Sequence, residues 1–267
     1  MGTIPVALTI AGSDSGGGAG IQADLKSFHA FGAFGTSAVT AITVQNTRGV
    51  SGVHPVPVEV VRAQIRAVAE DLPPAACKTG MLATAELVGA VAASIREHRL
   101  PAFVLDPVMV ASSGDRLLDA DAERTVVDEL LPLAALVTPN LDEAAILVGE
   151  AVEDEAGMRR AALALVRMGA RAALLKGGHL RGGELVDVLY DGREWRAWRR
   201  PRLATRHTHG TGCTLSAAVA AGLAHGRPLA RAVDDALDYV HRAMLAAPAL
   251  GSGHGPLNHM VPGPEAQ

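Results

Sequence analysis

Short apolar runs rich in β-branched residues alternate along this chain with longer Ala- and Leu-rich segments. This alternation is typical of strand–helix–strand units, whose crossover connections make neighbouring strands parallel. The predicted strands are Val6 to Ala11, Ala38 to Val44, Cys77 to Thr79, Phe103 to Asp106, Leu136 to Thr138, Ala172 to Lys176 and Leu185 to Tyr190. Helices are predicted near residues 20–31, 58–71, 84–97, 120–131, 142–149, 155–169, 213–225 and 228–246.

The apolar runs lack strict alternation, which indicates strands covered on both faces. We therefore expect an α/β fold, a three-layer α/β/α sandwich with a mostly parallel central sheet. The segment 184–201 differs, because alternating apolar residues flank Asp191-Gly192 and predict a hairpin that forms an antiparallel edge. The chain of 267 residues shows no repeat or linker, so residues 1–267 are expected to form a single domain, with 251–267 as a closing loop or a frayed tail.

Charge and cysteine content exclude several classes of protein. The formal net charge is −4 with dispersed basic residues, which argues against nucleic-acid binding. The apolar run from Pro5 to Ala11 is too short for a secretory signal or a membrane span, so we expect a cytoplasmic protein with no membrane partner. Cys77 and Cys213 are expected to be free thiols. The basic residues are nearly all arginines, so the lysines at 26, 78 and 176 stand out.

A glycine-rich turn, Gly12 to Gly20, follows the first predicted strand, and we expect its free backbone amides to face an anion or another ligand. It is not a Walker A loop, because no Lys-Ser/Thr pair follows the last glycine. The stretch Gly18 to Ala23 matches a loose dinucleotide-binding pattern. The acidic residue that would bind the ribose is missing, since no Asp or Glu lies between Asp24 and Glu59.

The segment Thr208 to Thr214 precedes a predicted apolar helix and contains two glycines. The amides of its first turn are donors without intrahelical partners, and the positive helix end would stabilise charge on a transferred phosphoryl group. At this helix start the thiol of Cys213 is expected to have a lowered pKa and to act as a base or an orienting group. The alternative is a capped helix with a small buried cysteine.

Charged side chains follow three further strands, and the carboxyl ends of parallel strands collect ligands. Asp106 and Glu143 could hold a hydrated Mg²⁺, and Lys176 could contact a polyphosphate. Each also has a structural interpretation: Asp106 could cap a turn, Asn140 and Glu143 could form a capping box, and Lys176 could be a solvated charge. Their joint placement at one edge favours phosphoryl transfer.

The histidines at 207, 209, 254 and 259 lack neighbours at metal-ligand spacing in the sequence. We therefore expect them to have structural or hydrogen-bonding roles rather than to bind zinc.

Taken in order, these motifs resemble those of the hydroxymethylpyrimidine and phosphomethylpyrimidine kinases of thiamine biosynthesis, in the ribokinase-like superfamily. The segments that carry the resemblance are Leu8 to Asp24, Val44 to Thr47, Lys78 to Met81, Thr138 to Leu141, Lys176 to His179 and His209 to Thr214. The resemblance implies a ribokinase-like fold and a homodimer. It also implies ATP- and Mg²⁺-dependent phosphorylation of 4-amino-5-hydroxymethyl-2-methylpyrimidine to its monophosphate and then to the diphosphate.

The resemblance also implies roles for individual residues. Gln45 would hydrogen-bond the aminopyrimidine, which its amide suits by offering a donor beside an acceptor. The substrate pocket would also include Gly12, Asp24 and Met81, and ATP would be bound by Lys176, Asn140 and Thr208. Asp106 and Glu143 would hold Mg²⁺. Gly210, Thr211 and Gly212 would form the anion hole, and Cys213 would activate the acceptor.

Cys213 stands where most sugar kinases have Asp, which argues against a sugar substrate. Pyridoxal or pyridoxine kinase activity and a catalytically inactive pyrimidine-binding module remain alternatives. The stretch Ser112 to Gly114 is a candidate mobile flap over the site.

Overall fold

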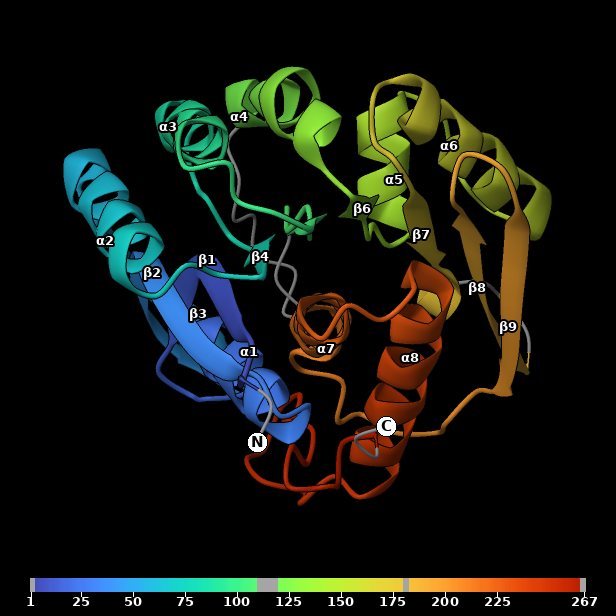
Figure 1. Ribbon diagram of the computed structural model, residues 1–267. Helices are drawn as coiled ribbons and strands as arrows, with labels where there is room; N and C mark the ends of the chain where they lie inside the picture. The colour runs from blue at the N-terminus through green and yellow to red at the C-terminus, as the bar shows by residue number, and fades with distance from the viewer. Residues whose placement is uncertain (1–2, 110–119, 180–182, 265–267) are drawn as a thin grey trace.

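Parallel strands form the centre of the sheet, and antiparallel strands flank it on both sides. The computed structural model describes residues 3–109, 120–179 and 183–264, and within them one nine-stranded sheet has the order β3-β2-β1-β4-β5-β6-β7-β8-β9 (Figure 1). The strands are β1 Val6–Asp14, β2 Phe34–Asn46, β3 Gly49–Pro55, β4 Ala76–Thr79, β5 Phe103–Leu105, β6 Leu136–Val137, β7 Ala173–Lys176, β8 Glu184–Tyr190 and β9 Trp195–Pro201. The predicted hairpin is confirmed as β8 and β9, which form an antiparallel edge.

Helices cover both faces of the sheet, which confirms the three-layer architecture (Figure 1). One face carries α1 Gly20–Ala30, α7 Thr211–Ala224 and α8 Leu229–Leu245. The other face carries α2 Val58–Asp71, α3 Ala85–Glu97, α4 Ala120–Thr125, α5 Leu141–Val148 and α6 Glu155–Arg167. The α4 helix continues into a π-helical turn and a short 3₁₀ turn, Leu131–Leu133, where Pro132 cannot donate the next helical hydrogen bond.

One strand, β3, was not predicted. Its sequence, Gly-Val-Ser-Gly-Val-His-Pro, contains two glycines and a proline, which are poor strand formers. It forms because the edge of β2 that faces away from β1 offers free backbone groups, with which residues 49–55 pair, as Ile42–His54 and Val44–Gly52 show. The sheet therefore has a second antiparallel edge, and β2 is longer than the predicted run.

Helix α7 is buried from Thr214 to Gly222, because it lies between the sheet and the helices α1 and α8. Its sequence is apolar on every side, as expected for a helix covered all round. Small residues allow close packing: a Cβ atom on Gly222 would lie 2.9 Å from the Cβ of Ala232 in α8. This packing holds the C-terminal half of α7 against α8.

The segment after α8 packs against the turn between β2 and β3 and against the start of α7. The amide of His254 donates to the carbonyl of Thr47 at 2.8 Å, and the amide of His209 donates to the carbonyl of Gly255 at 3.2 Å. The hydroxyl of Tyr239 donates to the carbonyl of His259 at 3.0 Å. These bonds join residues far apart in the sequence around the candidate site.

Among the described residues, no helix has the length and apolar character needed to cross a membrane.

Candidate active site

The predicted site residues come from the carboxyl ends of the parallel strands. Asp106 follows β5, Asn140 follows β6, and Lys176 ends β7. Because β5, β6 and β7 run parallel and adjacent, their ends reach the same edge of the sheet. There the amide of Lys176 donates to the carbonyl of Pro139 at 3.0 Å.

The first turn of α7 is held at this edge by Gly210. This glycine has a φ of 85°, and a Cβ atom on it would overlap the carbonyl oxygen of Gly18. Only glycine fits such a position. No side chain caps this helix end, while the amide of Thr211 donates to the carbonyl of Thr208 at 3.2 Å. The amides of Gly212 and Cys213 come next, before the first intrahelical bond of Thr214, and are therefore available for an anion.

Lys176 lies between this helix end and two carboxylates. Its Nζ is 3.4 Å from Oδ1 of Asp106 and 3.7 Å from Oε2 of Glu143. A Cβ atom on Gly212 would lie 3.2 Å from the same Nζ and 3.8 Å from Oδ2 of Asp106. The structure thus brings the helix amides, Lys176, Asp106 and Glu143 into one cradle, which is the arrangement that phosphoryl transfer requires.

The structural interpretation of Asn140 and Glu143 also holds. The Asn140 side chain accepts from the Glu143 amide at 2.8 Å, and the Glu143 carboxylate accepts from the Asn140 amide at 2.8 Å, a capping box. Burial raises the pKa of Glu143 to about 7. The positive charge of Lys176 lowers this pKa, and the negative charge of Asp106 raises it. The same carboxylate therefore caps α5 and faces Lys176.

The predicted pKa shift of Cys213 is wrong for the ligand-free protein. Burial raises the pKa of this thiol to about 11, although Lys78 and the Gly20 amide lower it. The helix end was expected to dominate, but removing a thiolate from water outweighs that effect here. The raised pKa favours the thiol over the thiolate, so a base role for Cys213 requires that bound substrates lower this pKa.

The prediction of free amides in the glycine-rich turn is also wrong at three positions. The carboxylate of Asp14 accepts from the amides of Gly16, Gly18 and Ala19 at 2.7, 3.0 and 2.8 Å. The same carboxylate lies 2.8 Å from Nε2 of His209. The turn is therefore organised around its own acidic residue, and these amides do not face a phosphate. Sequence reasoning missed Asp14, because the role of an Asp within such a turn depends on where its side chain folds.

The residues expected around the pyrimidine lie beside this turn. A Cβ atom on Gly12 would lie 3.5 Å from Sδ of Met81. The half-buried Gln45 accepts a hydrogen bond from the Thr43 hydroxyl at 3.0 Å, and that hydroxyl is 2.9 Å from the carbonyl of Ser13. Gln45, Gly12 and Met81 therefore border one region beside the glycine-rich turn.

Asp24 is fully buried beneath that region. Both of its carboxylate oxygens lie 3.0 Å from Nζ of Lys78, and one accepts from the Thr9 hydroxyl at 2.6 Å. Sequence reasoning assigned Asp24 to the substrate pocket and gave Lys78 no role. The structure joins them in an ion pair that has no exposed side-chain surface.

His259 bonds the segment after α8 to the first turn of α7. Its Nε2 is 2.8 Å from the hydroxyl of Thr214, in keeping with the hydrogen-bonding role expected of the histidines. Among the described residues, no cluster of three or more His, Cys, Asp or Glu side chains could hold a metal on its own. Ser112 to Gly114, the candidate flap, lies outside the described residues.

Replacing His259 by Gln is expected to reduce the loss of stability in acid. Burial lowers the pKa of His259 to about 4, and Lys26 contributes to the shift. As the pH falls from about 6.5 to about 4, the unfolded chain therefore binds a proton that the folded chain does not, and the free energy of unfolding decreases. Urea unfolding at about pH 7 and pH 4.5 measures this loss.

His254→Gln, a substitution of an exposed histidine in the same segment, is the control. Equal losses in the two variants would contradict the prediction.

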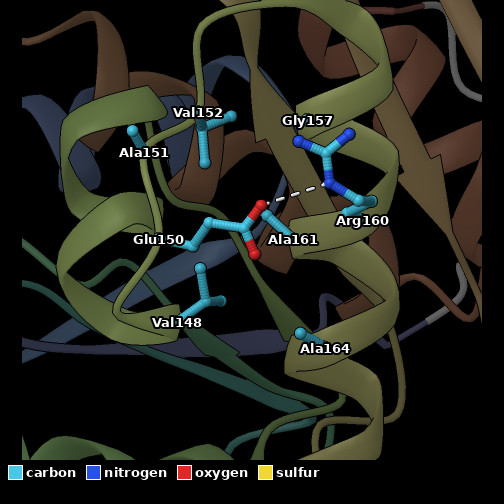
Figure 2. A pocket seen from close by; sticks show the side chains of 8 residues that line it. All are labelled: Val148, Glu150, Ala151, Val152, Gly157, Arg160, Ala161 and Ala164. Atoms are coloured by element: carbon cyan, nitrogen blue, oxygen red, sulfur yellow. Dashed lines mark hydrogen bonds and ion pairs between the residues drawn. The ribbon is translucent and has the colours of Figure 1, made fainter.

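A separate small pocket lies between the end of α5 and α6 (Figure 2). Its volume is about 60 Å³, and an ion pair between Glu150 and Arg160 crosses its mouth at 3.2 Å. None of the predicted site residues line it, and it is too small for a substrate with a heterocyclic ring.

A mostly parallel sheet between two layers of helices, with the start of a buried helix, a lysine and two carboxylates at the carboxyl edge of its parallel strands, is the arrangement of a ribokinase-like small-molecule kinase. The sequence matches the family model of phosphomethylpyrimidine kinase over residues 14–258, and the chain belongs to this family.

Relatives and solved structures agree with this assignment. The chain is 54% identical to the hydroxymethylpyrimidine/phosphomethylpyrimidine kinase of Rhizobium meliloti, over 95% of this chain and 96% of the relative. It is 50% identical to the thiamine biosynthesis bifunctional protein of Geobacter sulfurreducens, of whose length it spans 52%. The Bacillus subtilis pyridoxal kinase in complex with ADP superposes with a TM-score of 0.90 at 37% identity, covering 96% of this chain and 98% of that one. The Clostridium difficile phosphomethylpyrimidine kinase superposes with a TM-score of 0.81 at 39% identity, covering 90% and 99%.

Proposed function

We propose that this chain phosphorylates 4-amino-5-hydroxymethyl-2-methylpyrimidine with ATP, and then phosphorylates the monophosphate to the diphosphate for thiamine diphosphate biosynthesis. The observation that carries the proposal is the position of Lys176, 3.4 Å from Asp106 and beside the first turn of α7. This geometry suits a migrating phosphoryl group, because positive charge and free amides converge on one point. Family membership and the region formed by Gln45, Gly12 and Met81 support the pyrimidine as acceptor.

Each side chain then has a defined task. Lys176, with Asn140 and Thr208 nearby in the loops, would bind the ATP phosphates. The first-turn amides after Gly210 would stabilise charge on the transferred group, since they need not reorganise during the reaction. Cys213 would accept the proton of the hydroxymethyl group or orient its oxygen. In a loose transition state little base catalysis is needed, so both roles fit the chemistry.

Mg²⁺ fits the carboxylates at this edge. Asp106 and Glu143 supply oxygen ligands, and Mg²⁺ in kinases is commonly held by one or two carboxylates together with water and phosphate oxygens. The ion would neutralise charge on the phosphates, while the Ser216 hydroxyl keeps Asp106 in place at 3.1 Å.

An assay of ADP release tests the proposal. The purified chain with ATP and Mg²⁺ is expected to release ADP only when the pyrimidine alcohol is present, and mass spectrometry should detect the monophosphate followed by the diphosphate. Removing Mg²⁺ with a chelator is expected to abolish release. Pyrimidine binding without ADP release would instead support the inactive binding module.

Pyridoxal kinase activity is the second candidate, because solved pyridoxal kinases share this fold at 34–37% identity. A competition assay with both rings separates the two candidates. A larger specificity constant for pyridoxal than for the pyrimidine would overturn the substrate assignment.

We further propose that the chain acts as one kinase domain, forms a homodimer and works in the cytoplasm, where ATP is available. The exposed Ile42 and Val44 side chains on β2 offer an apolar surface for the partner copy. A single-chain mass in sedimentation equilibrium would contradict the dimer.

A further inference from the structure

Lys78 is a fully buried lysine for which neither the family motifs nor the cradle supply a role. It lies in β4, one residue before the carboxyl end of the strand, and its side chain has no exposed surface. Burying an ammonium group is costly unless it is paired and hydrogen-bonded. A fully buried lysine next to a reaction site therefore requires a physical explanation.

The ammonium of Lys78 lies between three groups of the candidate site. Its Nζ is 3.0 Å from both oxygens of Asp24 and 4.0 Å from Oδ2 of Asp106. The same Oδ2 atom of Asp106 would lie 3.8 Å from a Cβ atom on Gly212, the residue before Cys213 at the start of α7. Lys78 thus faces the substrate side through Asp24, and through Asp106 it faces the cradle and the start of α7.

It is informative that residue 78 is a lysine and not an arginine. Every other basic residue of the chain is an arginine except Lys26 and Lys176, and both of these also lie at the site. Lys26 donates to the carbonyl of Gly17 at 2.6 Å, and Lys176 lies in the cradle. Around Lys78 the space is narrow, because a Cβ atom on Gly80 would lie 3.1 Å from its Nζ. A compact ammonium fits there, whereas the larger planar guanidinium of arginine does not.

The ammonium stays charged in this position. Burial alone would lower the pKa of Lys78, but Asp24, Cys213 and Asp106 together raise it above its ordinary value. The group is therefore a fixed positive charge throughout the working pH range, not a proton donor.

We propose that Lys78 is a positioning residue for phosphoryl transfer, whose buried positive charge stabilises negative charge that develops beside Cys213 at the acceptor end of the site. This inference rests on the proposed assignment of Cys213 to the acceptor. The competing explanation is that Lys78 only neutralises Asp24. In that case its charge matters for folding and has no effect on the reaction.

The two explanations predict different results in a protein that lacks the negative charge of Asp24. In Asp24→Asn protein Lys78 no longer has to balance that carboxylate, so this variant is the matched control for the double variant Asp24→Asn/Lys78→Met. Relative to Asp24→Asn, we expect the double variant to have a kcat that is lower by about tenfold or more. The rate at which iodoacetamide alkylates Cys213 is expected to fall by a similar factor. KM for both substrates is expected to change much less. Equal kcat and equal alkylation rates in the two proteins would overturn the proposal.

A second double variant keeps the test available if Lys78→Met does not fold. Asp24→Asn/Lys78→Gln also removes the charge of Lys78, but the glutamine amide can hydrogen-bond the asparagine at position 24 in the place of the ammonium, which lies 3.0 Å from both Asp24 oxygens. Its kcat and its rate of Cys213 alkylation are expected to be lower than those of Asp24→Asn, and equal values would overturn the proposal. Alkylation is measured without ATP, with Cys213→Ser protein as background. A failure here is distinct from failure of the kinase proposal, which the ADP assay tests directly.

Discussion

Cys213→Ala protein is expected to retain pyrimidine binding while its kcat falls by about 100-fold or more. The thiol lies at the start of α7, and the charges of Lys78, Asp24 and Asp106 influence its pKa. The alanine variant lacks the sulfur atom, so it loses a proton acceptor or orienting group, while the cradle is left intact. Steady-state kinetics gives kcat, and isothermal titration calorimetry gives the affinity for the pyrimidine alcohol.

The other cysteine supplies the control. Cys77 is fully buried in β4, on the face of the sheet covered by α2 to α6, and Cys77→Ala is expected to keep its activity. If the Cys213→Ala and Cys77→Ala proteins had the same kcat, Cys213 would have no part in the mechanism.

Cys213→Ser separates the two roles proposed for the thiol. A serine hydroxyl can orient the acceptor through a hydrogen bond but is a far weaker acid. Recovery of most of the activity would indicate orientation, and a loss as large as in Cys213→Ala would indicate proton transfer.

Gly210→Ala is expected to reduce kcat/KM by about 100-fold or more, because small displacements of catalytic groups have effects of this size. The new Cβ would overlap the carbonyl oxygen of Gly18, so the first turn of α7 or the glycine-rich turn has to move. Either movement displaces the anion-binding amides from Lys176. ADP release at varied ATP concentration measures the effect.

Gly226→Ala is the control that tells whether the effect of Gly210→Ala comes from displacement of the α7 start or from backbone strain. Gly226 has a φ of 73°, similar to the 85° of Gly210, but a Cβ atom on it would meet nothing within 4 Å. This variant is expected to lose about 1 kcal/mol of stability through strain alone and to keep its activity. Comparable activities in the two variants would show that the position of the α7 start does not limit catalysis.

The sequence was sufficient to predict the layers and the edge of the sheet at which the site lies. The predicted strands and helices agreed with those of the structure, because apolar runs and glycines mark where buried elements begin and end. The strand β3 was missed because its pairing depends on the free outer edge of β2, not on its own residues. Lys78 and Asp14 were missed for a related reason, since their importance lies in contacts with distant segments.

The sequence alone determined the fold class, the family and the set of residues available for phosphoryl transfer, because these follow from local patterns and their order. Only the tertiary structure decided how those residues are charged and paired. Burial reversed the expected pKa shift of Cys213 and filled the glycine-rich turn with the carboxylate of Asp14. The physical reason is that desolvation and ion pairing depend on neighbours brought together from distant parts of the chain, which no local pattern specifies.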